Sequence, residues 1–243
     1  MKLNGLMLVA GLVVASGVTT ARADVPWNVP NGSNTVLSWQ NGRSDNGLFG
    51  SNVTVIGDTF FFVTNENFDA AASNGGQITK SDTLRVTVHA QPGRFFTEVI
   101  FASQGNYYVY GSNSSVDVQG NLTINDRNSP RTVSDAFSTV VAPDAGSAGN
   151  ATTMPVVGMD ADQYGTWYGG STVDFSLFGF PPVTSLDLIF TNTIIAISAP
   201  GETASIITLP NTQGSFSLSI VPAPSAAALL GLAGLGLASR RRR

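Results

Sequence analysis

The sequence has no cysteine, a single histidine and few charged residues, with 12 basic and 16 acidic side chains among its 243 residues. The absence of cysteine excludes disulfides, thiolate nucleophiles and cysteine-based zinc or iron–sulfur sites. The lone histidine excludes a metal centre with several histidine ligands. An apolar share of 42% argues against a disordered chain. The composition therefore predicts a packed protein without a cofactor, and it removes most familiar catalytic chemistry.

The first 23 residues follow the pattern of a secretory signal peptide. Met1-Lys2 provides a short positive start, and an apolar run follows from Leu6 to Val14. Ala21 and Ala23 then give the small-x-small pattern that precedes a cleavage site. We expect a helical signal peptide that is used by Sec-type export machinery and removed by a signal peptidase before Asp24. The mature chain would then be secreted.

The C-terminal part has three consecutive blocks. Val221-Pro222-Ala223-Pro224 contains two prolines, which interrupt a helix or a central strand. Residues 225–238 are apolar apart from Ser225, and they lead into a cluster of Arg240, Arg241, Arg242 and Arg243. A helix of about 14 residues would span roughly 21 Å, less than the roughly 30 Å hydrocarbon core. The pattern predicts a short transmembrane helix that holds the protein temporarily at the inner membrane, with the arginines on the cytoplasmic side.

This three-part tail resembles the PEP-CTERM sorting signal of exported bacterial proteins. In that family, a proline motif, an apolar segment and an arginine cluster are recognised by an exosortase, a membrane-embedded transpeptidase. The resemblance implies a bacterial cell that makes exopolysaccharide or an elaborate envelope. Ala223 stands where the family motif has glutamate. With this difference from the family motif, two outcomes are open: the transpeptidase cleaves the tail, or the protein retains it. An ordinary C-terminal anchor is the alternative interpretation.

Removal of both ends would leave a strongly acidic body. Residues 24–220 contain six basic and sixteen acidic side chains, which gives a net charge of −10. Nucleic acids and anionic membrane surfaces attract clustered lysine and arginine, so they should repel this body. The charge balance therefore argues against DNA or RNA as a partner.

The body is predicted to be all-β. Short segments rich in β-branched and aromatic residues alternate with Gly, Pro, Asn and Asp, which is typical of an antiparallel β-sandwich or jelly roll. Strands are expected over 35–40, 53–56, 59–63, 84–89, 94–102, 106–110, 115–118, 121–125, 131–141, 153–157, 163–168, 171–177, 185–190, 193–198, 204–209 and 215–221. The body, residues 24–220, is either one sandwich with a long loop near 142–150 or two small domains divided there.

Aromatic residues are the candidate ligand contacts of the body. Tyr108 and Tyr110 fall on one face of their predicted strand, while Tyr107 and Val109 fall on the other. With Trp167, the exposed rings could stack on sugars and bind a glycan. Burial in the core is the plainer interpretation for at least one of the two sets. The segment 95–110 is predicted to be a strand-turn-strand unit, and this stretch loosely resembles the β-rich bodies that precede such tails.

The charged residues of the body are weaker candidates for a functional site than the aromatic residues. Asp160 and Asp162 offer two carboxylates near Gly165, a fragment of a Ca²⁺ loop without its further ligands, and a surface turn explains them as well. Glu98, expected between Phe96 and Ile100 on one face, is a candidate general acid that lacks a visible second carboxylate. His89 has no recognisable nucleophile motif beside it.

These patterns together predict an exported, non-enzymatic protein of the cell surface or extracellular matrix that an exosortase-like system sorts. Its partners would be the export machinery, the transpeptidase, and envelope glycans or exopolysaccharide. A secreted carbohydrate-binding module is the alternative function, and an extracellular hydrolase is a further one.

Overall fold

The computed structural model describes residues 24–148, 153–209 and 216–224. The predicted signal peptide, the apolar segment and the arginine cluster lie outside these residues. Within them, the chain forms strands and no α-helix, and no helix there is long and apolar enough to cross a membrane. The all-β prediction for the body is therefore confirmed.

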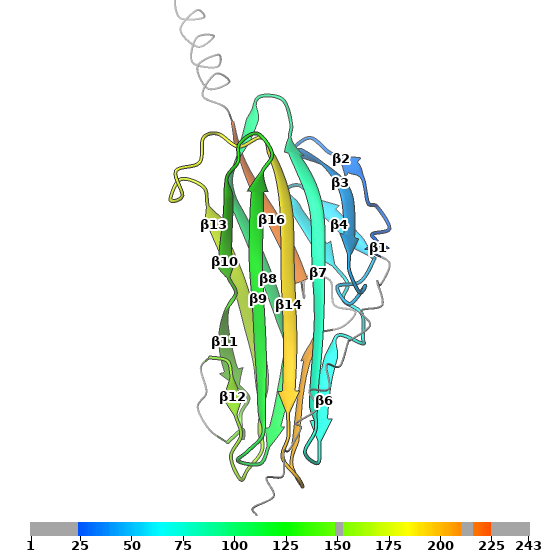
Figure 1. Cartoon of the computed structure of the whole chain (residues 1–243), viewed down its shortest axis with the longest axis vertical. Coiled ribbons are helices and arrows are strands. Elements are labelled where there is room, and N and C mark those ends of the chain that lie inside the picture. Colours follow the sequence, from blue (N-terminus) through cyan, green and yellow to red (C-terminus); the bar gives the residue numbers. More distant parts are fainter. Residues whose placement is uncertain (1–23, 149–152, 210–215, 225–243) are drawn as a thin grey trace, which may run out of the picture.

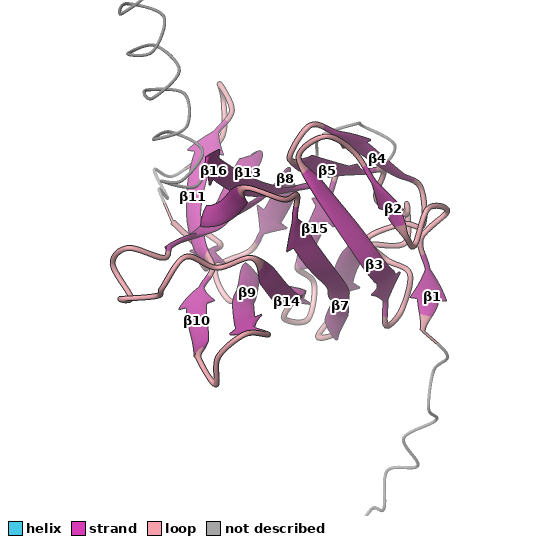
Figure 2. Ribbon diagram, turned by 90° about the horizontal axis from the view of Figure 1, so that it is seen from above, coloured by secondary structure: helices cyan, strands magenta, loops and turns pink. Residues whose placement is uncertain are grey.

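Two antiparallel sheets pack face to face, as Figures 1 and 2 show. Sheet A has the order β1-β3-β7-β14-β9-β10, with β2 beside β3 and β12 beside β9. Its strands are β1 (Val25–Pro26), β2 (Gly32–Ser33), β3 (Leu37–Ser44), β7 (Gln77–Ala90), β9 (Ser115–Asp126), β10 (Thr132–Ala136), β12 (Val156–Val157) and β14 (Ser185–Ile197).

Sheet B has the order β11-β13-β8-β16-β5-β4, with β15 beside β8 and β6 beside β15. Its strands are β4 (Val53–Ile56), β5 (Thr59–Phe62), β6 (Asp69–Ser73), β8 (Arg94–Tyr110), β11 (Ser138–Pro143), β13 (Gln163–Asp174), β15 (Thr203–Thr208) and β16 (Phe216–Pro224). Both sheets combine strands from before and after 142–150, because β7 pairs with β14 in sheet A and β8 pairs with β13 in sheet B.

Several strands are longer than the sequence predicted. The strand-turn-strand interpretation of 95–110 is wrong, because β8 runs without interruption for 17 residues. Gly105 lies inside this strand, and a Cβ atom there would lie 1.9 Å from the Ile207 carbonyl oxygen and 2.4 Å from Trp167 Nε1. Gly120 similarly makes room for Phe137 within β9. These glycines allow neighbouring groups to approach the backbone instead of forming turns.

Aromatic side chains join the two sheets in the core. The rings of Phe101 on β8 and Phe190 on β14 stack with centroids 3.2 Å apart, and Phe216 packs 4.2 Å from Phe101. All three are buried. Because strand residues alternate between the two faces, every second residue of β8 and β14 enters this core and the others face outward.

The two prolines lie in a part of β16 that, among the described residues, is paired on one side only, which agrees with the prediction that they exclude a helix or a central strand. β16 continues through Pro224, with Pro222 opposite Phe96 and Pro224 opposite Arg94 of β8. A register shift between Val221 and Pro222 accommodates the first proline. On its other side, β16 pairs with β5 only from Phe216 to Ser219. Within the described residues, the motif is therefore paired with a strand on one side only, where proline is tolerated.

Candidate functional site

Four tyrosines lie on the outer face of sheet B. Tyr108 of β8 lies directly opposite Tyr164 of β13 in the register of the two strands. Tyr110 follows Tyr108 on the same face, and Tyr168 lies opposite Gln104 farther along the sheet. We call Tyr108, Tyr110, Tyr164 and Tyr168 the tyrosine face. Gln104 and Tyr110 are six positions apart on β8, so the face extends about 20 Å along the strands.

The four rings differ in their partners. The Tyr108 hydroxyl donates a hydrogen bond of 2.9 Å to Asp162 Oδ1, and the Tyr164 hydroxyl donates one of 3.2 Å to the Ala145 carbonyl oxygen. The bond to Asp162 raises the pKa of Tyr108 above its usual value near 10.0. Tyr110 and Tyr168 are 42% and 47% exposed. Within the described residues, neither hydroxyl makes a hydrogen bond.

Polar side chains lie between these rings. Asn106 and Thr166 are opposite each other between the Tyr108–Tyr164 pair and the Gln104–Tyr168 pair. An exposed ring offers an apolar face, and an adjacent amide or hydroxyl group offers hydrogen bonds. This combination suits a flat ligand that has both apolar faces and many hydroxyl groups.

The prediction that Trp167 contacts a ligand is wrong. Its side chain is fully buried, and its Nε1 donates a hydrogen bond of 3.2 Å to the Ile207 carbonyl oxygen. The ring points into the sandwich over Gly105, so it cannot contact a glycan. Tyr107 is also buried, at 4% exposure. The predicted alternation of Tyr107 and Val109 against Tyr108 and Tyr110 is confirmed.

The weak Ca²⁺ candidate does not form a cluster. Asp162 is engaged with Tyr108, and no three acidic or histidine side chains converge anywhere among the described residues. Asp160 and Asp162 are both exposed and precede β13. Their arrangement corresponds to the plainer interpretation of two aspartates in a surface turn.

Glu98 does not share a face with Phe96. Phe96 is buried in the core, whereas Glu98 and Ile100 are half-buried, because the register with β16 shifts at this point. Asp174 lies directly opposite Glu98 and supplies a second carboxylate that the sequence did not show. Hydrogen bonds from Ser176 lower the pKa of Asp174. A general acid requires the opposite shift.

His89 makes a cross-strand contact with Ser185. The His89 Nδ1 and Ser185 Oγ atoms are 2.9 Å apart, and the two residues face each other in the pairing of β7 with β14. Within the described residues, no carboxylate forms a hydrogen bond with the ring. The arrangement therefore lacks the acid that orients a catalytic histidine.

Asp82 of β7 is a deeply buried carboxylate, with 1% exposure. Burial raises its pKa, while backbone hydrogen bonds from Asn46, Leu48, Phe49 and Thr83 oppose the shift. These amides hold its two oxygens at 2.7 to 3.1 Å. Asp82 therefore fixes the loop after β3 and has a structural role.

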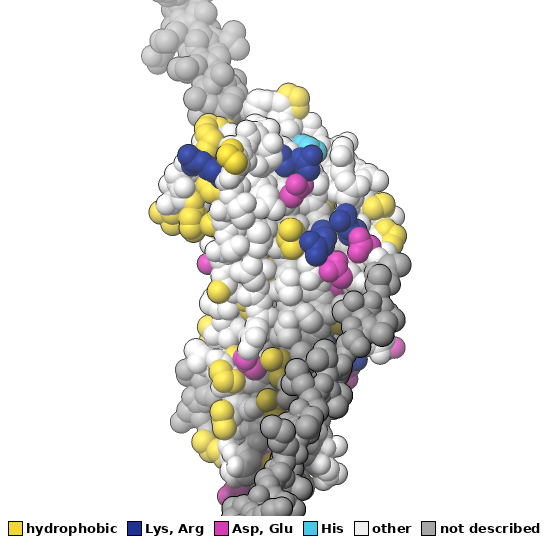
Figure 3. Space-filling view, in the orientation of Figure 1, with side chains coloured by type: hydrophobic (Ala, Val, Ile, Leu, Met, Phe, Trp, Pro, Cys, Tyr) yellow, Lys and Arg dark blue, Asp and Glu magenta, His cyan; other side chains and the backbone are white. Residues whose placement is uncertain are grey.

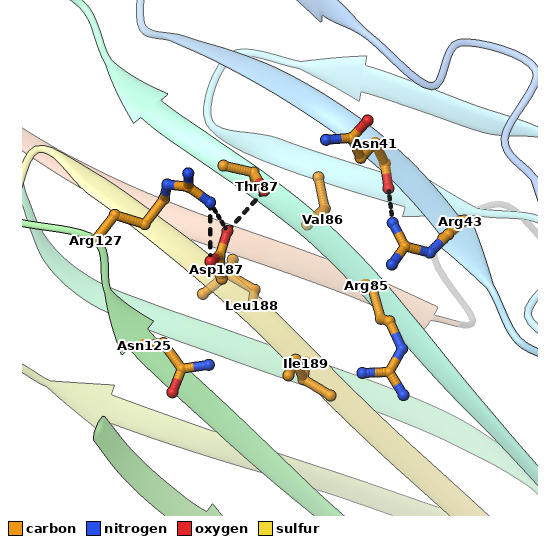
Figure 4. Close-up of a pocket in the computed structure, with 10 residues that line it drawn as sticks. All are labelled: Asn41, Arg43, Arg85, Val86, Thr87, Asn125, Arg127, Asp187, Leu188 and Ile189. Carbon is orange, nitrogen blue, oxygen red and sulfur yellow. Dashed lines mark hydrogen bonds and ion pairs between the residues drawn. The ribbon is translucent and has the colours of Figure 1, made fainter. Parts of the chain in front are cut away.

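The outer face of sheet A has a depression that the sequence analysis missed. It encloses about 300 Å³, and Arg43, Arg85 and Arg127 surround it (Figure 4). The Arg127 Nη1 atom lies 2.9 Å from Asp187 Oδ1, and Thr87 donates to the same oxygen at 2.7 Å. Figure 3 shows this group of charges on a face that is otherwise largely white.

Each arginine of the depression already has an acidic partner. Arg43 pairs with Asp24 at 2.6 Å, and Arg85 pairs with Asp45 at 3.2 Å. The set of three arginines and three aspartates is therefore electrically neutral, which suits an uncharged polar ligand better than an anion. The three arginines come from separate segments of the sequence, so only the strand order brings them together.

No family model and no curated protein matches the chain. Among solved structures, the carbohydrate-binding module TmCBM61 in complex with β-1,4-galactotriose is 10% identical, with a TM-score of 0.20 over 81% of this chain and 89% of that one. The CBM22-1 and GH10 modules of a Clostridium thermocellum xylanase, complexed with xylohexaose, are 9% identical, with a TM-score of 0.15 over 56% and 27% of the two chains. The infectious bursal disease virus protein VP2 is 11% identical, with a TM-score of 0.16 over 76% and 49%. Likenesses at this level carry no argument about function.

Proposed function

We propose that this chain is an exported β-sandwich protein of the bacterial envelope or extracellular matrix, without catalytic activity. Its C-terminal tail would serve as a sorting signal for an exosortase-like transpeptidase. The tail would hold the protein at the inner membrane until the body is transferred to the cell surface or to exopolysaccharide. The proposal rests on the order of the proline motif, the apolar segment and the arginine cluster in residues 221–243.

The placement of the proline motif is the structural observation that supports this proposal. Val221 to Ala223 are half-buried, and among the described residues the stretch to Pro224 pairs only with β8. A membrane enzyme needs access to an extended peptide, and a strand with one unpaired edge offers it. The first residue of the apolar segment, Ser225, directly follows the last paired residue. The motif therefore lies at the junction between the folded body and the tail.

Replacement of the four arginines tests the sorting function. With Arg240 to Arg243 changed to serine, the cost of moving the end of the tail across the membrane falls, because each arginine resists transfer into the bilayer. We expect the variant to shift from the membrane and surface fractions of the host to the medium. Lys80→Ser, which removes a cation of the body, is the control. An unchanged distribution of the arginine variant would contradict the proposal.

Glycan binding is the second candidate function, and the exposure of Tyr110 and Tyr168 favours it. The hydroxyl groups of these rings make no hydrogen bond in the described part of the chain, and Gln104 and Asn106 lie beside the rings on the same face of the sheet. Rings of this kind stack on the apolar side of a sugar, while amides bind its hydroxyl groups. The tyrosine face would then attach the exported protein to exopolysaccharide or envelope glycans.

A glycan array with single variants tests this function. We expect Tyr110→Ala and Tyr168→Ala each to weaken binding about tenfold, which corresponds to about 1.4 kcal/mol. Ile56→Ala removes a more exposed apolar side chain elsewhere on sheet B and is the control. If the wild type binds no glycan at high ligand concentration, or if all three variants bind as the wild type does, this function is excluded for the tyrosine face.

A further inference from the structure

The loop between β13 and β14 presents an exposed apolar tip. Leu177 is 80% exposed and Phe178 is 49% exposed, and they are consecutive. We call residues 175–182 the apolar loop. Leu177 is the most exposed of the large hydrophobic side chains that the structure describes. Exposed apolar residues that are scattered singly are ordinary, but an adjacent pair at a loop tip indicates a contact surface.

Hydrogen bonds and ring contacts hold the apolar loop in one conformation. The Asp174 carboxylate accepts from the Ser176 amide at 2.8 Å and from the Ser176 hydroxyl at 2.7 Å. At the base of the loop, the rings of Phe175 and Phe180 are 5.3 Å apart. Arg131 donates to the Gly179 carbonyl oxygen and lies 5.7 Å from the centre of the Phe180 ring. The tip is therefore displayed on a supported base.

The apolar loop starts and ends beside the strand segment from which the tail leaves. The Phe175 amide donates to the Thr97 carbonyl oxygen at 2.9 Å, and Val183 forms a bridge with Phe96. Pro222 pairs with the same Phe96 from the other side. Two neighbours of one strand are about 10 Å apart. The base of the loop and the exit of the tail are therefore close together, at the upper end of the view in Figure 1.

We propose that the apolar loop inserts into the lipid interface while the tail holds the protein in the membrane. This inference rests on the proposed function of the tail. Because Ser225 directly follows the paired Pro224, no spacer separates the folded body from the apolar segment. A tail in the bilayer therefore places this end of the sandwich at the membrane surface, within reach of Leu177 and Phe178. Figure 3 shows hydrophobic side chains and a basic group at this end.

Charged groups of both signs lie at the end of the body that carries the apolar loop. The body is acidic, with a net charge of −10 over residues 24–220, and it is repelled by anionic lipid. At this end, Arg131 contacts the loop and Arg94 begins β8 beside Pro224, while Asp174 and Glu98 place two carboxylates beside the base of the loop. These guanidinium groups favour phosphate headgroups. The tail brings this end of the body to the membrane surface, and the apolar tip of the loop enters the lipid interface.

Lipid quenching of single tryptophan probes tests the inference on the full chain in phosphatidylcholine vesicles that carry brominated acyl chains. The native Trp27, Trp39 and Trp167 are 3%, 6% and 0% exposed, so they give a constant background. Phe178→Trp reports on the loop, and Leu230→Trp reports on the tail. Val157→Trp is the control, because Val157 is 58% exposed beside Ser115, at the far end of β9. Eleven residues of β9 separate that end from the loop end, about 36 Å.

We expect brominated lipid to quench the emission of Phe178→Trp and of Leu230→Trp by about half or more, and to leave that of Val157→Trp unchanged. Quenching of the tail probe without quenching of the loop probe overturns the inference and leaves the proposed function standing. Quenching of the loop probe alone contradicts the tail function and overturns the inference as stated, because the loop would then bind lipid without the tail. Quenching of neither probe overturns both. A blue shift of Phe178→Trp without vesicles also overturns the inference, because the tail or a second copy would then cover the loop.

A paired serine variant gives a second measurement. Leu177→Ser with Phe178→Ser should weaken the binding of the full chain to vesicles about tenfold or more, because two apolar side chains lose their transfer into lipid. Ile56→Ser with Val157→Ser changes two exposed apolar residues outside the loop, at 59% and 58% exposure, and should leave binding unchanged. Both double variants change exposed side chains, so near-ultraviolet circular dichroism should remain that of the wild type. Equal binding by both double variants would overturn the inference.

Discussion

The two outer faces of the sandwich use polar residues in opposite ways. On sheet A, hydroxyl, amide and carboxylate groups bond to one another from strand to strand. On sheet B, exposed rings lie beside amide and hydroxyl groups, and the hydroxyl groups of two of the rings make no hydrogen bond in the described part of the chain. Strands β7, β9 and β14 place no phenylalanine, tyrosine or tryptophan on the outer face of sheet A.

The contacts on sheet A form a ladder. Its rungs are the pairs Ser81 with Thr193 at 2.8 Å, Thr83 with Thr191 at 3.0 Å, Thr87 with Asp187 at 2.7 Å, and Thr123 with Ser134 at 2.9 Å. Cross-strand pairs of this kind stabilise a sheet. Sheet A therefore uses its outer groups for its own stability, whereas the tyrosine face leaves groups available for a ligand.

The largest expected effect is a loss of the support beneath the tyrosine face. Gly105→Ala would place a Cβ atom 1.9 Å from the Ile207 carbonyl oxygen and 2.4 Å from Trp167 Nε1. Strand β15 or the indole ring must move, so we expect urea unfolding to show a loss of about 3 kcal/mol. The tyrosine face would lose order while the ladder on sheet A persists.

Gly93→Ala is the control for this variant. An alanine methyl group at position 93 would meet no atom within 4 Å, and the φ of Gly93 is +78°, so the substitution should cost about 1 kcal/mol through backbone strain alone. If the two alanine variants lose the same free energy, the close packing over Gly105 does not support sheet B.

Removal of one carboxylate should weaken the ladder of sheet A moderately. Asp187 accepts from Arg127 at 2.9 and 3.0 Å and from Thr87 at 2.7 Å. The site is partly exposed, so Asp187→Ala should lower the free energy of unfolding by about 1 kcal/mol. Asp117→Ala, which removes one exposed contact with Gln119, should cost less. An equal cost for both would show that the contacts of Asp187 stabilise the sheet no more than one exposed hydrogen bond does.

High pH should act on the tyrosine face through Tyr108. Its pKa is raised by the hydrogen bond to Asp162, above the usual 10.0. A raised pKa in the folded state means that this stabilisation is fully present below pH 10.0 and is lost as the pH rises through the folded value. Ultraviolet titration of tyrosinate should show that Tyr108→Phe removes a late-titrating group.

Asp162→Asn gives the matched control for this titration. The substitution should move the titration of Tyr108 toward pH 10.0. It should leave the titration of Tyr107 unchanged, because burial and Asp144 raise the pKa of Tyr107. If the Asp162→Asn variant titrates as the wild type does, the Asp162 contact does not act on Tyr108 in solution.

Strand alternation made the core and the tyrosine face predictable. The inward positions Leu84, Val86 and Val88 and the division of Tyr107 from Tyr108 follow from local period alone, and burial confirms both. Strand length was not predictable. A glycine inside a strand that makes room for a distant ring cannot be distinguished, from its local sequence, from a glycine in a turn. Gly105 and Trp167 are 62 positions apart in the sequence.

Candidate residues whose role depends on long-range pairing were also beyond the sequence. Trp167 and Tyr168 are neighbours, and only the register of β13 shows that the first is buried and the second exposed. The arginines of the sheet A depression come from β3, β7 and the turn after β9. No local pattern relates such positions, because strand order alone determines their proximity.

The smallest expected effect tests the difference between the outer faces of sheets A and B most directly. Tyr110→Ser with Tyr168→Ser removes two half-exposed rings that have no hydrogen-bond partner in the described part of the chain, so the free energy of unfolding should change by less than about 0.5 kcal/mol. Thr83→Ala with Thr191→Ala removes one rung of the ladder on sheet A and should cost about 1 kcal/mol. Urea unfolding measures both. If the tyrosine variant loses more free energy of unfolding than the threonine variant, the rings stabilise the sandwich itself. The tyrosine face would then be no more available to a ligand than the ladder on sheet A is.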